Sequence, residues 1–256
     1  MPYDSKQPIE YFQRRRDEIV AWRHEMHQHP ELAYKEHWTS DFVAARLADF
    51  GYEVARGVGG TGVVATLRGN GAAAIGLRAD MDALPMEERN SFAHKSHNAG
   101  CMHACGHDGH SAMLLAAARY FSEHRDVPGT LHFVFQPAEE GEAGAAAMIR
   151  DGLFERFPMN AIYGMHNWPG LDEGVIAARV GPQMAAFDTF EIVLRGQGAH
   201  GAMPHQGQDS LVAASTLALQ LQTIVARSVD PLETAVVSVT QIHGGDAWNV
   251  LPGEVI

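Results

Sequence analysis

The stretch Ala73-Ala74-Ile75-Gly76-Leu77-Arg78 decides the fold. Its first five residues are small or apolar, and such a continuous run is typical of a central strand that is buried on both faces of a sheet. Asp80-Met81-Asp82 follows almost at once, so two carboxylates come just after the strand. In open α/β sheets ligands bind beyond the carboxyl ends of the strands. The stretch therefore predicts a buried strand with a candidate site at its end.

Helix-like and strand-like segments alternate around this strand. Apolar spacing and turn residues predict helices over 11–27, 36–50, 109–124 and 143–150, and strands over 52–55, 62–67, 73–78, 131–135 and 161–165. Gly69-Asn70-Gly71 predicts a hairpin between strands 62–67 and 73–78. The alternation indicates an α/β fold whose sheet is mostly parallel, with helices on its faces.

The pattern changes near Gly181-Pro182. Phe190, Ile192 and Leu194 alternate with polar residues, as in a half-exposed strand, and a helix over 210–227 and a strand over 235–242 are expected next. We therefore expect two domains, an α/β domain over 1–181 and a small α+β domain over 182–256.

Composition limits the possible functions. The chain has 256 residues, 46% of them hydrophobic, and a formal net charge of −12, which argues against binding to nucleic acid or to anionic membranes. No apolar run reaches the ~18 residues of a membrane span, and we expect no signal peptide at the N-terminus. Only two cysteines are present, so no disulfide framework is expected and a cytoplasmic location fits.

The stretch Met102-His103-Ala104-Cys105-Gly106-His107-Asp108-Gly109-His110 is rich in metal-ligand side chains. Cys105 and His107 are two apart, so they can bind one ion only if Gly106 breaks the helix between them. For an isolated pair of this kind, a buried cysteine beside a surface histidine is the more common interpretation. However, Glu139, Glu140 and His166 each follow a predicted strand and are expected to lie near Cys105 and His107. This convergence favours a metal site instead. We expect His110, His103 and Cys101 to be structural. His27 and His29 lie at a helix end, where we expect no acidic or thiol partner nearby, so we expect them to be structural too.

The pair Glu139-Glu140 follows the expected strand over 131–135. Adjacent side chains of an extended backbone point in opposite directions, so one carboxylate could bind a metal while the other accepts a proton from a water whose pKa the metal lowers to about 7. The alternative is a solvated acidic turn. Asp80 and Asp82 would hold ligand histidines through hydrogen bonds, the alternative being a capping loop before the next helix.

Seven segments, taken together in order, resemble one known family. The chain is similar to the M20 metallopeptidases, and among them to the aminoacylase-like amidohydrolases: hippurate hydrolase, N-acyl-amino-acid amidohydrolase and indoleacetyl-amino-acid hydrolase. The matching segments are His29-Pro30-Glu31-Leu32, Arg78 to Pro85, Met102 to His110, Gln136 to Gly141, Gly164 to Asn167, Gly198 to His205, and Asn249 to Pro252.

The resemblance implies a phosphorylase/hydrolase-like domain that binds two divalent ions, with zinc, manganese, cobalt and nickel all compatible. It implies the following roles: Cys105 as bridging ligand; His107, Glu140 and His166 as terminal ligands; Glu139 as general base; and Asp82 as support of the metals. It also implies a ferredoxin-like lid and dimerisation domain over 182–256. There, His200 matches a histidine that reaches the active site, in several relatives that of a partner subunit, and Asn249 matches a substrate contact.

The implied reaction is hydrolysis of the amide of an N-acyl amino acid such as hippurate, by a homo-oligomer. A dipeptidase or a biosynthetic N-acetyl-amino-acid deacetylase on the same scaffold is the alternative enzyme, and a catalytically incomplete metal-binding fragment is the alternative outside enzymes. Family members run well over a hundred residues further. We therefore expect a truncated chain that lacks one histidine ligand and part of the lid.

Overall fold

The computed structural model describes residues 6–256, and the chain divides into two compact units. The first ends at Glu173 and the second begins at Gly174, a few residues before the boundary expected at 181/182. We describe each unit by itself. The assignment of the two units as catalytic and lid domains stays a prediction.

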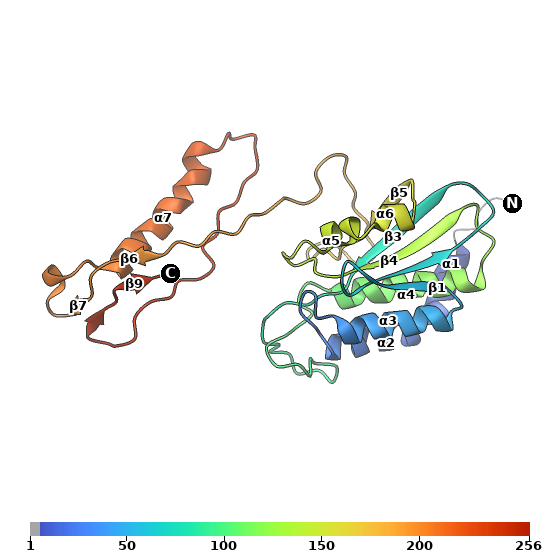
Figure 1. Cartoon of the computed structure of the whole chain (residues 1–256), viewed down its shortest axis with the longest axis horizontal. Coiled ribbons are helices and arrows are strands. Elements are labelled where there is room, and N and C mark those ends of the chain that lie inside the picture. Colours follow the sequence, from blue (N-terminus) through green and yellow to red (C-terminus); the bar gives the residue numbers. More distant parts are fainter. Residues whose placement is uncertain (1–5) are drawn as a thin grey trace. The chain divides into compact units, whose positions relative to one another are not determined.

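The first unit contains a five-stranded sheet in the order β1-β2-β4-β3-β5 (Figure 1). The strands are β1 Glu53–Val58, β2 Gly62–Leu67, β3 Ala74–Asp80, β4 Thr130–Gln136 and β5 Ala161–Gly164. β3 runs parallel to both of its neighbours, whereas β1–β2 and β2–β4 are antiparallel pairs. The α/β class is confirmed, and the sheet is mixed.

The predicted hairpin between β2 and β3 is wrong, because β4 lies between these two strands. The glycine-rich turn contacts the segment that leads into β4 instead, where the Asn70 N–H donates to the Val127 carbonyl at 3.1 Å. A turn signal reports only that the chain changes direction. The pairing follows from burial, since β4 is buried from Leu131 to Gln136 and takes the position between β2 and β3.

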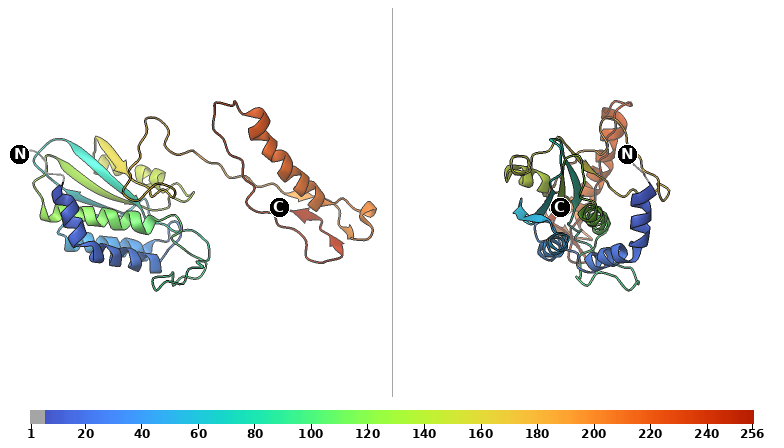
Figure 2. Two further views of the ribbon diagram at one scale, coloured as in Figure 1. Left: turned by 180° about the vertical axis from the view of Figure 1, so that it is seen from behind. Right: turned by 90° about the vertical axis from the view of Figure 1, so that its right-hand side faces the viewer.

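Helices cover both faces of this sheet (Figure 2). The first face carries α2 Arg16–Gln28, α3 His37–Asp49 and α4 His107–Glu123, and the short α1 Lys6–Arg14 precedes them, so the single helix expected over 11–27 is interrupted at Arg15. α5 Gly144–Arg150 and α6 Leu153–Arg156 lie on the second face.

The alternation of side chains along β4 divides the core in two. Phe133 and Phe135 pack with Leu115 of α4 on the first face, whereas Val134 packs with Met148 of α5 on the second. Successive residues of a strand point to opposite faces. Because both faces are apolar, the sheet is fixed firmly between its two helical layers, and the strand ends are held in place.

The second unit has little regular sheet. β6 Leu194–Arg195 pairs with β9 Glu254–Val255, β7 Ala199–His200 pairs with β8 Val250–Leu251, and α7 spans Ser210–Ser228 after the short 3₁₀ turn Pro204–Gln206. The Asp209 carboxylate caps α7 by accepting from the backbone N–H groups of Leu211 and Val212, at 3.1 and 3.0 Å.

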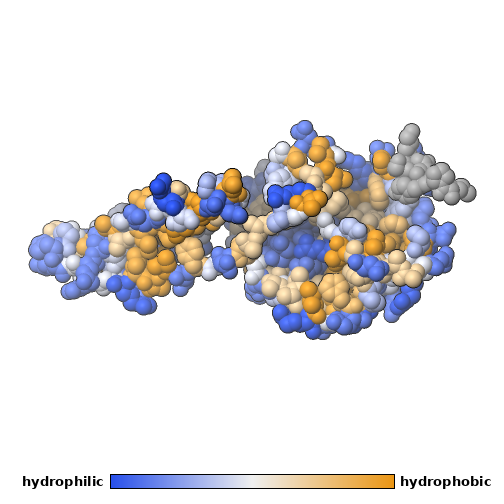
Figure 3. Space-filling view, turned by 90° about the horizontal axis from the view of Figure 1, so that it is seen from above, coloured by the Kyte–Doolittle hydropathy of each residue, from blue (hydrophilic) through white to orange (hydrophobic). Residues whose placement is uncertain are grey.

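Two strands expected in the second unit are wrong or shorter than predicted. Only Leu194 of the alternating stretch over 190–194 belongs to a strand, and residues 235–242 form none. A strand needs a hydrogen-bonded neighbour, and neither residues 190–193 nor residues 235–242 pair with a strand among residues 6–256. Apolar side chains such as Phe190 and Val236 are consequently exposed, and Figure 3 shows apolar surface on this unit. No helix of the described residues is both long and apolar enough to cross a bilayer.

Candidate metal centre

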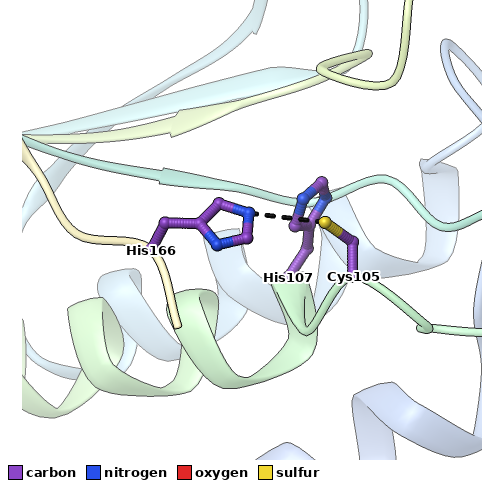
Figure 4. A group of neighbouring side chains, drawn as sticks. All are labelled: Cys105, His107 and His166. Carbon is purple, nitrogen blue, oxygen red and sulfur yellow. Dashed lines mark hydrogen bonds between the residues drawn. The ribbon is translucent and has the colours of Figure 1, made fainter. Parts of the chain in front are cut away.

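Three side chains that the sequence marks as candidate ligands converge in the first unit (Figure 4). Cys105 lies just before α4, His107 is the first residue of α4, and His166 follows β5. The Cys105 Sγ lies 3.3 Å from the His166 Nε2, and one donor atom from each residue lies within 4.8 Å of the others. Segments 61 residues apart therefore meet beyond the carboxyl ends of the parallel strands β3, β4 and β5.

Gly106 makes the approach of Cys105 to His107 possible. It adopts the left-handed conformation at φ +93° and forms the N-cap of α4, so Cys105 stays outside the helix while His107 begins it. A Cβ at this position would also collide with the side-chain amide of Asn167. The tight turn expected between the two candidate ligands thus requires glycine for both reasons.

His107 presents an unpaired nitrogen to the site. Its Nδ1 donates to the Asp82 carbonyl at 2.8 Å and lies 3.3 Å from the Asp82 Oδ1. Nε2 therefore keeps its lone pair, and this fully buried atom has no hydrogen-bond partner among the described residues. It faces the Glu139 Oε2 and the Glu140 Oε1, each at 3.9 Å. An unsatisfied buried acceptor among carboxylates is costly unless a cation completes it.

The two glutamates converge, and the expectation that they point in opposite directions is wrong. The backbone after β4 bends, with Ala138 at φ +52°, and so brings both carboxylates to the same nitrogen. Asp82 also fixes this bend, because its Oδ2 accepts the Glu140 backbone N–H at 2.9 Å. Asp82 consequently holds both the imidazole of His107 and the backbone of Glu140.

The site carries an excess of negative charge. Burial, a hydrogen bond to Glu140 and the charges of the nearby carboxylates raise the pKa of Cys105 to about 12. Burial, together with repulsion from Asp80 and Glu140, also raises the pKa of Glu139. Burial lowers the pKa of His107, but the hydrogen bond to Asp82 and the charge of Asp80 outweigh it and raise the pKa overall. A cation at this position would offset the repulsion.

The donor set fits a divalent metal. Thiolate, imidazole and carboxylate are ligands of zinc and of related transition metals. His107 belongs to two groups of side chains that could each hold an ion. One group contains Cys105 and His166, and the other contains Glu139 and Glu140. A second buried atom without a partner among the described residues, the Glu140 Oε1, points to the same place.

Asp80, His107 and His110 form a third group of suitable geometry, but the donor atoms of Asp80 and His110 are already in use. The Asp80 Oδ1 lies 2.6 Å from the His110 Nδ1, and its Oδ2 accepts from Arg78 at 2.7 Å. Burial raises the pKa of Asp80, yet His110, His107 and Arg78 outweigh it and hold the pKa well below its usual range. Asp80 thus remains charged and holds His110, whereas the sequence predicts that it holds a ligand histidine.

Three carboxylates that hold other residues of this unit were not predicted. Glu36 is fully buried, accepts the Ala138 N–H at 2.8 Å and the Thr61 hydroxyl at 2.5 Å, and so holds the bend before Glu139. The expectation that His27 has no acidic neighbour is wrong, because its ring lies 2.9 Å from Asp108 and 3.1 Å from Glu88. These partners are distant in sequence, so no local pattern indicates them.

His200 and Asn249 lie in the second unit. His200 ends β7 opposite Val250, and the Asn249 carbonyl accepts the Gly201 N–H at 2.7 Å. The side chains of His200 and Asn249 are exposed, and their roles in a reaction stay predictions.

Comparison with known proteins identifies the class. Residues 76–252, more than half of the chain, match peptidase family M20/M25/M40. The chain belongs to this family, as the sequence motifs predict. It is 46% identical over 236 residues to a hippurate hydrolase of Campylobacter jejuni, covering 92% of this chain and 61% of the relative. It is 47% identical over 242 residues to an N-acyl-L-amino acid amidohydrolase of Geobacillus stearothermophilus, covering 93% and 65%.

Solved structures agree with this assignment. A putative aminohydrolase of methicillin-resistant Staphylococcus aureus superposes with a TM-score of 0.75 at 32% identity, covering 98% of this chain and 68% of that one. The Bacillus subtilis YXEP protein, described as a dinuclear metal-binding peptidase of family M20, superposes at 0.66 with 33% identity, covering 93% and 62%. The chain spans less than two thirds of the length of the two curated relatives named above (61% and 65%).

Proposed function

We propose that this chain belongs to a metal-dependent hydrolase that cleaves the amide bond of N-acyl amino acids. The observation that carries the proposal is the buried Nε2 of His107, which has no hydrogen-bond partner among residues 6–256 and faces Glu139 and Glu140. Cys105 and His166 lie beside it. Cys105, His107, Glu140 and His166 would together hold two divalent ions; zinc, manganese, cobalt and nickel all suit these donors.

When bound, such ions would supply Lewis-acid chemistry, lowering the pKa of a water and polarising the substrate carbonyl. Glu139 is the group that moves the proton. Its pKa is raised by burial, so its carboxylate can accept a proton from the attacking water and return it to the leaving amine. Asp82 keeps His107 in the tautomer whose Nε2 lone pair faces the site.

The substrate class rests on the names of the relatives. Two of them are named for hydrolysis of hippurate and of N-acyl-L-amino acids. A relative from Bacillus subtilis, 42% identical, is named N-acetyl-L-cysteine deacetylase, and one from Saccharolobus solfataricus, also 42% identical, is named a carboxypeptidase. A deacetylase or a peptidase on the same site is therefore the second candidate.

The proposal also assigns roles to the second unit. We expect it to act as a lid and to pair with a second copy of the chain, because apolar residues such as Leu219 and Val236 are exposed on it. His200 and Asn249 would contact substrate. A cytoplasmic location is part of the proposal, since both cysteines are free thiols.

Metal content and turnover test the proposal together. Release of benzoate from hippurate should require metal and stop when a chelator is added. Glu139→Gln should lower turnover by ~10²–10⁴-fold with metal still bound, because only the proton acceptor is lost. Glu142→Gln, an exposed glutamate of the same bend, is the matched control and should leave turnover unchanged. Metal-replete protein that hydrolyses no acyl amino acid or peptide would favour a non-catalytic metal-binding fragment instead.

A further inference from the structure

The segment that carries His166 has few attachments of its own. It follows β5, a strand of only 4 residues at the edge of the sheet, whose last pair joins Arg78 of β3 to Gly164. Met165, Asn167 and Trp168 are all exposed. A candidate ligand on such a segment needs another restraint if it is to be held in one position.

His110 supplies contacts of the required kind. It is buried in the first turn of α4, and its Nδ1 donates to the charged Asp80 at 2.6 Å. Its Nε2 lies 3.0 Å from the backbone nitrogen of Asn167 and 2.5 Å from the side-chain Oδ1 of the same residue. The rings of His110 and His166 also meet edge to face, with centroids 4.5 Å apart. His110 thus touches both His166 and the residue after it.

Asn167 connects this contact to the other candidate ligands. Its amide lies directly over Gly106, the residue between Cys105 and His107, where no Cβ would fit. Asp80, which anchors His110, is held in turn by Arg78 at 2.7 Å. A continuous set of contacts therefore runs from the central strand β3 through α4 to the segment after β5.

We propose that His110 and Asn167 form a clamp that positions His166 against Cys105 and His107. The inference rests on the proposed metal centre and deepens it. His110 is a positioning residue in this arrangement and not a ligand, although it lies in a group of metal-compatible geometry, because both of its ring nitrogens are engaged. The clamp keeps the His166 Nε2 beside the Cys105 Sγ, at 3.3 Å, before any ion binds.

Cobalt titration of the whole chain tests the clamp without measuring turnover. Co²⁺ is added to wild-type protein, His110→Ala, His166→Ala and the double variant, and its visible absorption gives affinity and geometry. His110→Ala should weaken Co²⁺ binding by ~10–100-fold, with a changed ligand-field spectrum but with the thiolate–cobalt band of Cys105 retained. If the residue acts through His166, the double variant should bind no more weakly than His166→Ala alone.

The controls separate the possible failures. His37→Ala removes an exposed histidine of α3 and should bind as the wild type does. The exposed Asn167→Ala serves as a second variant if His110→Ala does not fold; it should also weaken binding in the wild-type background and not in His166→Ala. Effects that add in the double variants, or unchanged affinity in both single variants, would overturn the clamp alone. Wild-type protein that takes up no Co²⁺ would overturn the proposed function with it.

Discussion

Asp82 meets His107 at two atoms: its carbonyl accepts the Nδ1 proton at 2.8 Å, and its Oδ1 lies 3.3 Å from the same nitrogen. The remaining carboxylate oxygen accepts the Glu140 N–H at 2.9 Å. A single residue just after β3 therefore fixes, through its backbone carbonyl and its carboxylate, an imidazole from α4 and a glutamate from the bend after β4. This arrangement explains how two candidate ligands from separate elements keep a common orientation.

Asp82→Asn should weaken divalent metal binding by ~10–100-fold, because an amide cannot accept from both His107 and the Glu140 backbone. Competition against a chromophoric chelator measures the dissociation constant. Asp172→Asn, in an exposed stretch, is the matched control. Equal affinities in the two variants would show that Asp82 does not support the centre.

Cys105→Ser should change the metal preference. A thiolate favours soft ions such as zinc over manganese, whereas a hydroxyl oxygen does not, so the affinity for Zn²⁺ should fall more than that for Mn²⁺. Parallel titrations with the two ions measure the ratio. Cys101→Ser is the control, since this buried cysteine belongs to none of the metal-compatible groups found among the described residues. An equal loss for both ions would argue against direct ligation by Cys105.

Leu115→Ala should destabilise the first unit by about 2–5 kcal/mol, because the fully buried leucine packs between α4 and the sheet and leaves a cavity when shortened. Met113→Ala on the same helix, where the side chain is 44% exposed, should change stability by only about 0.5 kcal/mol or less. Urea unfolding followed by the fluorescence of the buried Trp22 compares them. Similar midpoints for both variants would contradict the packing described for α4.

Glu36→Gln should alter the pH dependence of stability. Burial raises the pKa of Glu36 in the folded protein, so its contribution to stability is fully present below the unfolded pKa of about 4.3 and is lost as the pH rises through the folded pKa. Glutamine can still accept the Ala138 N–H and can donate to Thr61, and it carries no charge. The variant should therefore gain in free energy of unfolding, relative to wild type, as the pH rises from about 4 towards neutrality.

Urea unfolding at a series of pH values checks this prediction. Glu142→Gln, at an exposed position, should instead follow the wild-type curve at every pH. If the Glu36→Gln curve also runs parallel to wild type, the carboxyl is not desolvated as the structure shows.

Much of the fold could be predicted because apolar patterning is local. β2 has the predicted bounds, Gly62–Leu67, and α7 extends the predicted helix by a single residue, to Ser228. The same patterning failed over 190–194 and 235–242, where strands were expected. A strand forms only against a neighbour, and a pattern of alternating residues does not say whether one is present.

Most of the candidate site could also be predicted, since its residues follow strands or begin a helix and so lie at one end of the sheet. Cys105, His107 and His166 meet there as expected. The directions of Glu139 and Glu140 were not predictable, because they depend on a bend that Glu36 and Asp82 hold from elsewhere in the chain. The partners of His27 were missed for the same reason.

The sequence by itself determined the family, the α/β class and the residue types of the metal centre, because these depend on composition and on spacing along the chain. Only the tertiary structure decided that β4 separates β2 from β3, that both glutamates face His107, and that His110 holds the segment of His166. Strand order and side-chain direction follow from packing between segments many residues apart.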